Sequence, residues 1–327
     1  MKLGKYLFAL MVLVLAMNSC KKDDDSDVQA APPRDRGEQY LVDLDSIEEY
    51  LSTHFYNYEE FATNPNSTDF EILFDTIAGD NSDKTPLIDQ VSSKMVLDAD
   101  DVEYKLYYLV VREGLGDQPK FADSTYLDYK GTLINDTTFD SSPNPVWFDL
   151  VSVVQGFREI AKEFKGSTSF VENPDGTFTY QDYGIGAMFI PSGLAYFNEP
   201  PFGVPLYSPL VFRFNLYLAN ESDHDRDHVP SYLEDLDGNE NFSLAGDDTD
   251  EDNLADFVDA DDDNDGTLTR DEDLEPDPDL SVDSNGDGDP TNDIGDGNPM
   301  NDDTDGDGIP NYLDPDDSES RFPDDDN

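Results

Sequence analysis

The 327-residue sequence contains a single cysteine, Cys20, so no disulfide can form within one chain. Basic residues are also scarce: 19 Lys and Arg stand against 76 Asp and Glu, which gives a formal net charge of -57 at pH 7. This charge repels DNA, RNA and anionic lipid, excludes electrostatic binding of polyanions, and favours divalent cations as partners. The length allows one packed domain with flanking parts, or two domains.

The N-terminal apolar run, Tyr6–Met17, is too short to span a bilayer as a stable anchor. Two lysines precede it and Cys20 follows it, which is typical of a secretory signal. The ending resembles a loose bacterial lipobox, which implies that Cys20 is lipidated and becomes the mature N-terminus. The alternative is an ordinary signal peptide with an incidental cysteine. Lys21–Asp25 resembles the tag that sends lipoproteins of the Bacteroidetes to the outer face of the outer membrane, so we expect a lipid-anchored, surface-exposed envelope protein.

The acidic residues are concentrated at the C-terminal end. From Glu221 onward the sequence holds 41 acidic residues and three arginines, whereas the preceding part has ordinary aromatic content. This contrast predicts a globular part followed by a polyacidic part. The predicted divisions are a signal peptide at 1–20, a flexible tether at 21–39, an N-terminal helical extension at 40–101, a packed domain at 102–219 and an acidic segment at 220–327.

Local patterns predict the elements of the globular part. Ser46 and Glu49 form a capping box, and apolar residues at helical spacing predict a helix over Ile47–Ala62. We expect this helix to pack on the downstream domain; the alternative is a dimer arm. Downstream, the predicted elements are strands at Asp101–Arg112, Phe121–Gly131, Trp147–Leu150, Ala187–Ile190 and Leu210–Leu218, a hairpin of Ser169–Glu172 with Thr177–Tyr183, and a helix at Phe157–Phe164. Antiparallel strands with one short helix indicate an α+β domain.

The stretch Asp128–Ser142 (DYKGTLINDTTFDSS) combines a strand, a turn and an aromatic residue beside a carboxylate. It resembles the first half of an FKBP-type peptidyl-prolyl isomerase domain. Further segments match that family in the same order: Val153–Phe157, Phe189–Tyr196, Val204–Pro205 and Leu210–Phe212. The resemblance covers roughly 102–218 and implies an antiparallel sheet wrapped on one short helix.

The resemblance also implies an activity, cis–trans isomerisation of X-Pro bonds in unfolded or exported proteins, which needs no catalytic cofactor. The amide C–N bond has partial double-bond character and a barrier of roughly 18–20 kcal/mol, so a dry aromatic pocket that favours the twisted amide suffices. In the implied pocket, Phe157 forms the floor, and the walls are Tyr129, Phe139 and Phe212, with Val153 and Val154 beside them. The Val154 N–H and the Tyr196 hydroxyl donate hydrogen bonds to substrate carbonyls. Asp140 lies next to the reacting carbonyl.

Three positions depart from the family pattern. Gln155 interrupts one motif, Phe157 stands where tryptophan is usual, and Phe197 stands where glycine normally follows the tyrosine. The bulky loop Phe197–Gly203 is placed to cover the site. These departures keep open a non-catalytic protein that binds proline-containing segments on this fold.

The acidic segment repeats the spacing of a calcium loop. Measured from Asp261, carboxylates fall at positions one, three, five and twelve, with glycine at six, which is the EF-hand arrangement of hard oxygen ligands around a sharp turn. The four matching sets are Asp223, Asp225, Asp227 and Glu234; Asp248, Asp250, Asp252 and Asp259; Asp261, Asp263, Asp265 and Glu272; and Asp303, Asp305, Asp307 and Asp314. Flanking helices are not predicted, and the last set resembles thrombospondin type 3 calcium repeats. The alternative is a disordered acidic tail.

Together these patterns predict a lipid-anchored envelope isomerase whose irregular C-terminal segment binds structural calcium. The competing hypothesis is a surface binding or adhesion protein, in which the isomerase-like domain is an inert scaffold and the calcium repeats form a stalk.

Overall fold

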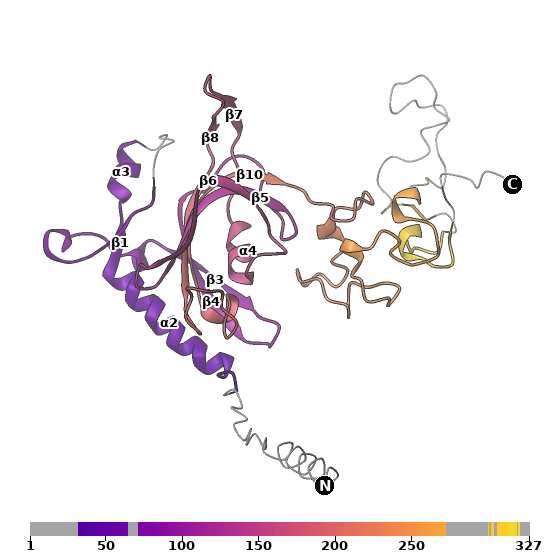
Figure 1. Ribbon diagram of the computed structural model, residues 1–327, viewed down its shortest axis with the longest axis horizontal. Coiled ribbons are helices and arrows are strands. Elements are labelled where there is room, and N and C mark those ends of the chain that lie inside the picture. Colours follow the sequence, from indigo (N-terminus) through magenta and orange to yellow (C-terminus); the bar gives the residue numbers. More distant parts are fainter. Residues whose placement is uncertain are drawn as a thin grey trace, which may run out of the picture. The chain divides into compact units, whose positions relative to one another are not determined.

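The computed structural model describes residues 32–64, 71–272, 300, 302–303, 306–318 and 320, of which all from Arg36 onward belong to one compact unit. Its body is a six-stranded antiparallel sheet with strand order β3-β4-β9-β10-β5-β6 (Figure 1). The strands are β3 (Ser92–Leu97), β4 (Glu103–Arg112), β5 (Ser124–Leu133), β6 (Thr138–Asp149), β9 (Gly184–Ile190) and β10 (Leu210–Asn220).

Helices cover both faces of this sheet, with α4 (Gln155–Ala161) on one side and α2 (Arg36–Thr53) on the other (Figure 1). For that reason every residue of the central strand β9 is buried. On the α4 face, Phe157, Ile160 and Phe164 join one apolar core. Gly156 permits this close approach, because a Cβ there would lie 2.3 Å from Cγ2 of Ile190. The predicted fold class, an antiparallel sheet around one short helix, is confirmed.

The N-terminal helix packs on the body as expected, but its bounds differ from the prediction. Ser46 lies inside α2, where its hydroxyl donates to the Val42 carbonyl (2.9 Å), and is not a cap. Ile47, Tyr50 and Leu51 are buried in the second core, on the opposite face of the sheet from α4. The helix ends at Thr53, since the next residues pair into a sheet.

Smaller elements complete the body. These are β1 (His54–Tyr56), α3 (Tyr58–Thr63), β2 (Phe74–Thr76), β7 (Ser169–Glu172) and β8 (Phe178–Gln181). Strands β1 and β2 pair with each other, and β7 and β8 form the predicted hairpin. Strand β3 lies within the predicted helical extension and yet pairs with β4 in the main sheet. In the part of the chain that is described, no helix combines the length and apolar character needed to cross a membrane.

Four short 3-10 turns lie among the described residues of the acidic segment. They are η4 (Ser231–Leu233), η5 (Asp256–Val258), η6 (Thr269–Asp271) and η8 (Asn311–Leu313). Each occupies positions nine to eleven of one predicted calcium set, directly before the acid at position twelve. The described residues of the four sets therefore share this turn, and none of them belongs to an α-helix.

Candidate functional sites

Aromatic rings from four elements meet above the N-terminal end of α4. The ring of Phe157 lies 5.3 Å from that of Phe212, at 90°, and Phe212 lies 5.5 Å from Phe139, at 87°. Tyr129 completes the group, 6.2 Å from Phe212. Such edge-to-face arrangements fix the rings relative to one another. Phe157 and Phe212 are buried, whereas Tyr129 and Phe139 are partly exposed, so the cluster has a rigid base and an accessible side.

One side of this aromatic cluster carries a polar pair. The Tyr129 hydroxyl donates to Oδ2 of Asp140 at 2.6 Å. Burial raises the pKa of Tyr129 above its ordinary value, and the Asp140 carboxylate raises it further, so the hydroxyl keeps its proton. Burial and the charge of Asp140 also raise the pKa of Tyr196. Two protonated phenols thus lie near one carboxylate beside the rings.

Gly131 on β5 leaves room for the rings of Phe139 and Phe212. A Cβ at this position would lie 2.7 Å from Cζ of Phe139 and 2.9 Å from Cε1 of Phe212. No Cβ tolerates contacts this short, so one ring would have to move. The glycine that interrupts the strand pattern of the sequence is therefore required by the packing of two site residues.

Helix α2 holds the segment that carries Tyr196. Arg36 donates to the Gly193 carbonyl at 2.9 Å, and the buried Asp43 accepts hydrogen bonds from the backbone and hydroxyl of Ser192. Helix α2, on the face of the sheet opposite α4, thereby holds the segment that carries Tyr196.

Phe197 does not cover the site. Its ring is buried against Tyr207 at 5.0 Å, and the guanidinium of Arg36 lies 4.5 Å from its centroid. Phe197 has a positive φ of 47°, which turns the chain away at the position where glycine is expected. Farther along the loop, Phe202 is fully exposed. The Phe197 side chain, which departs from the family pattern, therefore packs against Arg36 of α2 and Tyr207.

The structure brings most of the predicted pocket residues together. Those in direct ring or polar contact, or electrostatically coupled, are Tyr129, Phe139, Asp140, Phe157, Tyr196 and Phe212. Val153 and Val154 are partly buried and pack against the same core. The prediction missed Phe148 on β6, whose ring lies 5.0 Å from Tyr129 and 5.6 Å from Phe157. The strand pattern placed Phe148 in a strand, but which face it occupies depends on the register with β5.

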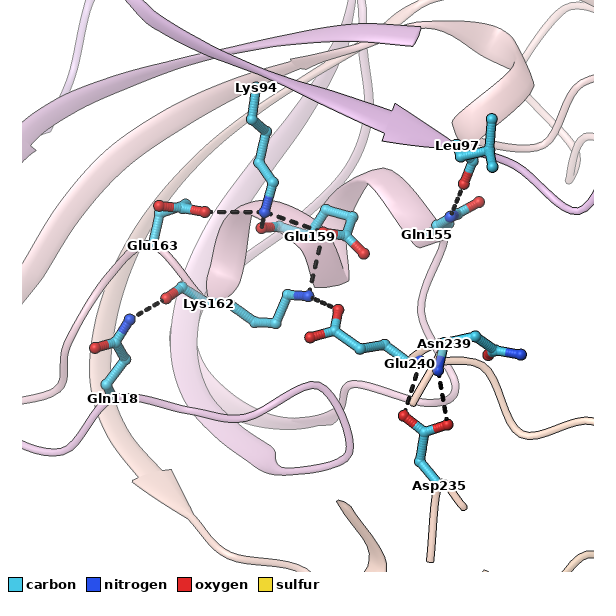
Figure 2. Close-up of polar contacts among 10 residues, drawn as sticks. All are labelled: Lys94, Leu97, Gln118, Gln155, Glu159, Lys162, Glu163, Asp235, Asn239 and Glu240. Carbon is cyan, nitrogen blue, oxygen red and sulfur yellow. Dashed lines mark hydrogen bonds and ion pairs between the residues drawn. The ribbon is translucent and has the colours of Figure 1, made fainter. Parts of the chain in front are cut away.

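A network of charges joins α4 to the acidic segment (Figure 2). Lys162 pairs with Glu159 on its own turn (3.2 Å) and with Glu240 in the segment after β10. Lys94 on β3 pairs with Glu159 (3.1 Å) and Glu163 (2.9 Å). Burial alone would raise the pKa of Glu159, but the ammonium groups of Lys162 and Lys94 outweigh it and lower that pKa. The acidic segment is therefore fastened beside the helix that carries Phe157.

The four predicted calcium sets share two backbone features in their described residues. In each, the backbone N–H of position nine donates to the carbonyl of the residue before position one; in the first set Ser231 donates to Ser222 at 2.9 Å. Position six has a positive φ in every set, whether the residue is glycine or not; the four are His228, Asn253, Gly266 and Gly308. The sharp turn that the calcium-loop pattern requires is thus present in all four.

Three of the acidic clusters, one of them formed by Asp248, Asp250 and Asp252, have buried oxygens without hydrogen-bond donors in the described chain. In the first, one carboxylate oxygen from each of Asp225, Asp227, Glu234 and Asp262 lies within 4.8 Å of the others. Burial, reinforced by the neighbouring carboxylates, raises the pKa of Glu234 to about 10 and that of Asp262 to about 11. The second contains Asp261, Asp263 and Asp265; Glu272, whose pKa is raised to about 9 by burial and then by these three, lies close by.

A fourth cluster, Asp235, Asp237 and Asp247, differs in its hydrogen bonds. Asp247 accepts the backbone N–H groups of Leu236 (2.9 Å) and Ser243 (2.9 Å), and Asp235 accepts two more. These carboxylates are already paired with backbone donors and brace a loop. Members of the first two clusters also accept backbone N–H groups, as Asp227 does from Val229, but those clusters keep other buried oxygens without a donor in the described chain. No such oxygen is found on Asp235, Asp237 or Asp247.

Other predicted ligands have different placements. Asp248, Asp250 and Asp252 form a further cluster, whereas Asp223 and Asp303 at position one accept backbone N–H groups of their own loops. Asp259 and Asp314 directly follow their 3-10 turns. Asp305 and the predicted lipidation site Cys20 lie outside the described residues.

Taken together, the body is an α+β fold that presents an aromatic cluster with a phenol–carboxylate pair. Sequence comparison finds similarity to FKBP-type peptidyl-prolyl cis–trans isomerases. The chain is 34% identical over 114 residues to FkpA of Escherichia coli (strain K12), covering 34% of this chain and 36% of the relative. It is 31% identical over 115 residues to Mip of Coxiella burnetii, covering 34% of this chain and 43% of the relative. This chain thus spans less than half the length of these curated relatives.

Two further comparisons concern structure and the acidic segment. The crystal structure of FkpA from Escherichia coli aligns with a TM-score of 0.32 at 24% identity, covering 56% of this chain and 62% of that one. A family model described as BamM C-terminal matches residues 224–282, which lie in the acidic segment.

Proposed function

We propose that this protein is a peptidyl-prolyl cis–trans isomerase that acts on X-Pro bonds of exported or unfolded proteins. The observation that supports the proposal most directly is the aromatic cluster with Tyr129 and Asp140 at its side, in a chain that is 34% identical over 114 residues to the FKBP-type isomerase FkpA. The chemistry needs no nucleophile, only a site that favours the twisted amide over the planar one.

Each residue has a role in this proposal. The rings of Phe157, Phe212 and Phe139 take the proline ring and exclude water, which weakens amide resonance. The Tyr196 hydroxyl and the Val154 N–H donate to substrate carbonyls. Asp140, oriented by the Tyr129 hydroxyl, lies next to the carbonyl that rotates. No metal or other cofactor takes part in this step.

A protease-coupled proline peptide assay tests the activity. Tyr196→Phe and Asp140→Ala are expected to lower kcat/KM at least tenfold, because each removes a polar group from the site. Phe170→Ser on the exposed hairpin strand β7 is the control and should leave the rate unchanged. A wild-type rate equal to the uncatalysed background would reject the enzyme and leave a binding role.

We also propose that the acidic segment binds structural calcium. The observation that supports this is the set of buried carboxylate oxygens, such as both Oε of Glu272 and Oδ2 of Asp263, that have no hydrogen-bond donor in the described chain. Leaving a buried charge unpaired is costly, and a hard divalent cation with oxygen ligands removes the cost. Calcium titration followed by circular dichroism tests this, with EGTA as the reversal; an unchanged spectrum and melting temperature in millimolar calcium would reject it.

Lipid anchoring at Cys20 in the outer membrane is a further part of the proposal, supported by the lipobox-like sequence alone. Labelling with a radioactive fatty acid should mark the wild type and not Cys20→Ser, and the variant should leave the membrane fraction. Surface exposure would appear as accessibility to added protease in intact cells. An unlabelled wild type would reject the anchor without affecting the isomerase proposal.

The second candidate function is a non-catalytic surface binding or adhesion protein. The aromatic cluster would then bind proline-containing segments without turnover, and the calcium-loaded repeats would act as a stalk. Binding of a proline peptide that persists with no isomerase activity would favour this candidate.

A further inference from the structure

The calcium proposal assigns each cation to one linear set of residues, but the first cluster contains a residue from another set. Asp225, Asp227 and Glu234 are positions three, five and twelve of the first set. The fourth member, Asp262, stands at position two of the third set, where the linear pattern places no ligand. Its neighbours Asp261 and Asp263 belong to a separate cluster.

The burial of these groups shows that the first cluster is enclosed. Glu234 is 0% exposed and Asp262 is 1% exposed. Both carboxylate oxygens of each have no hydrogen-bond partner in the described chain, and neither do both oxygens of Asp225 and Oδ2 of Asp227. The carboxylates of Glu234 and Asp262 are enclosed, lie close together, and have no hydrogen-bond partner in the described chain. This arrangement indicates a binding position for a cation.

The spacing of the oxygens selects the cation. The four oxygens lie within 4.8 Å of one another. Calcium–oxygen distances are about 2.3–2.6 Å, so oxygens on opposite sides of one calcium ion are about 4.6–5.2 Å apart. Magnesium needs about 2.0–2.1 Å and keeps most of its water, which an enclosed four-carboxylate site does not accommodate.

The side chains of successive residues in the third loop point in different directions, which explains how Asp262 reaches this site. Asp261, Asp263 and Asp265 turn toward the centre of their own loop, as their mutual cluster shows. Asp262 lies between them, and its backbone N–H donates to the buried Thr269 hydroxyl of the same loop at 3.3 Å. The third loop therefore presents one carboxylate to the first loop while its other acids serve their own cluster.

We propose that Asp225, Asp227, Glu234 and Asp262 form one calcium site shared between the first and third loops. This inference rests on the proposed calcium binding. It adds that Asp262, a residue of the third loop, is a ligand of the ion held by the first loop. One ion then ties the segment that follows β10 to the loop at 259–272, and loading of the first site depends on the placement of the third loop.

Calcium binding to the full mature chain, measured by isothermal titration calorimetry, tests the shared site. Asp262→Asn and Glu234→Gln should each remove or weaken the same ion by about tenfold or more, because affinity in such sites depends on the number of charged ligands. The double variant should lose no more than one ion. Glu251→Gln, an exposed acid of the second loop, carries the same charge change and should bind like the wild type.

Folding of the body is checked by its peptide isomerase or peptide-binding signal, which should be equal in all variants. If Asp262→Asn binds calcium like Glu251→Gln while Glu234→Gln loses an ion, the shared site is wrong and the calcium proposal stands. If the wild type binds no calcium, the calcium proposal itself fails, and the shared site fails with it.

Discussion

The carboxylate of Asp43 on α2 accepts two hydrogen bonds from Ser192, one from its backbone N–H at 2.8 Å and one from its hydroxyl at 2.6 Å. Asp43 is 1% exposed and Ser192 is 0% exposed, so no water competes for these bonds. The pair fixes the start of the 3-10 turn η3 (Ser192–Leu194), four residues before Tyr196. A helix outside the isomerase-like region thus positions a candidate catalytic hydroxyl.

Asp43→Asn is therefore expected to affect both stability and catalysis. Oδ2 of Asp43 accepts both Ser192 donors, while Oδ1 accepts the side-chain amide of Gln39 at 2.6 Å. Asn has only one acceptor oxygen, so its NH2 group would face a donor on one of these sides, and the free energy of unfolding should fall by about 1–3 kcal/mol. The isomerase rate should fall with it, because the Tyr196 segment loses its fastening. Chemical denaturation and the peptide assay measure the two effects. Asp45→Asn, an exposed acid on the same helix, is the matched control, and equal stability of the two variants would contradict the positioning role.

Gly131→Ala should distort the aromatic cluster. The added methyl group would meet the rings of Phe139 and Phe212 at less than van der Waals distance, which typically costs about 1–3 kcal/mol in a packed site. Thermal unfolding measures the loss of stability. A second substitution, Phe139→Leu, should restore part of the lost stability in the double variant by removing one of the two rings. No recovery would mean that the strain lies elsewhere.

The salt bridges on α4 predict a stability that falls in acid. The folded-state pKa of Glu159 is below its ordinary value of 4.5, because Lys162 and Lys94 hold it ionised despite burial. Its contribution is fully present above the unfolded pKa and is lost as the pH falls through the folded pKa. The stability difference between wild type and Glu159→Gln should be constant near pH 7 and shrink below about pH 4.5. A difference that does not change between pH 7 and pH 3 would contradict this pairing.

The turn at position six of the calcium sets predicts opposite effects for two substitutions. Gly266 has a φ of 101°, so Gly266→Ala forces a side chain into a conformation that costs about 1–2 kcal/mol, and calcium affinity should fall. His228 occupies the same position of the first set with a φ of 85°, so His228→Gly should leave calcium affinity equal or higher. Calorimetric titration of both variants measures the effect, and weaker binding by His228→Gly would show that its side chain matters.

Features that depend on local spacing could be predicted from the order of residues alone. The order of motifs from Asp128 to Phe212 predicted the sheet, the helix α4 and six residues that meet at one site. The spacing of one, three, five and twelve predicted four loops, and all four have the same hydrogen bond at position nine and the same positive φ at position six, because turn geometry is set within a dozen residues.

Contacts between segments far apart in the sequence could be found only in the folded chain. Asp43 and Ser192 are 149 positions apart, Asp262 reaches the ligands of another loop, and Phe148 faces Tyr129 through the register of β5 with β6. The start of α2 at Arg36 could not be predicted from local spacing either, because it depends on a sheet face that later strands form. Such contacts arise from chain packing, which leaves no periodic pattern along the sequence.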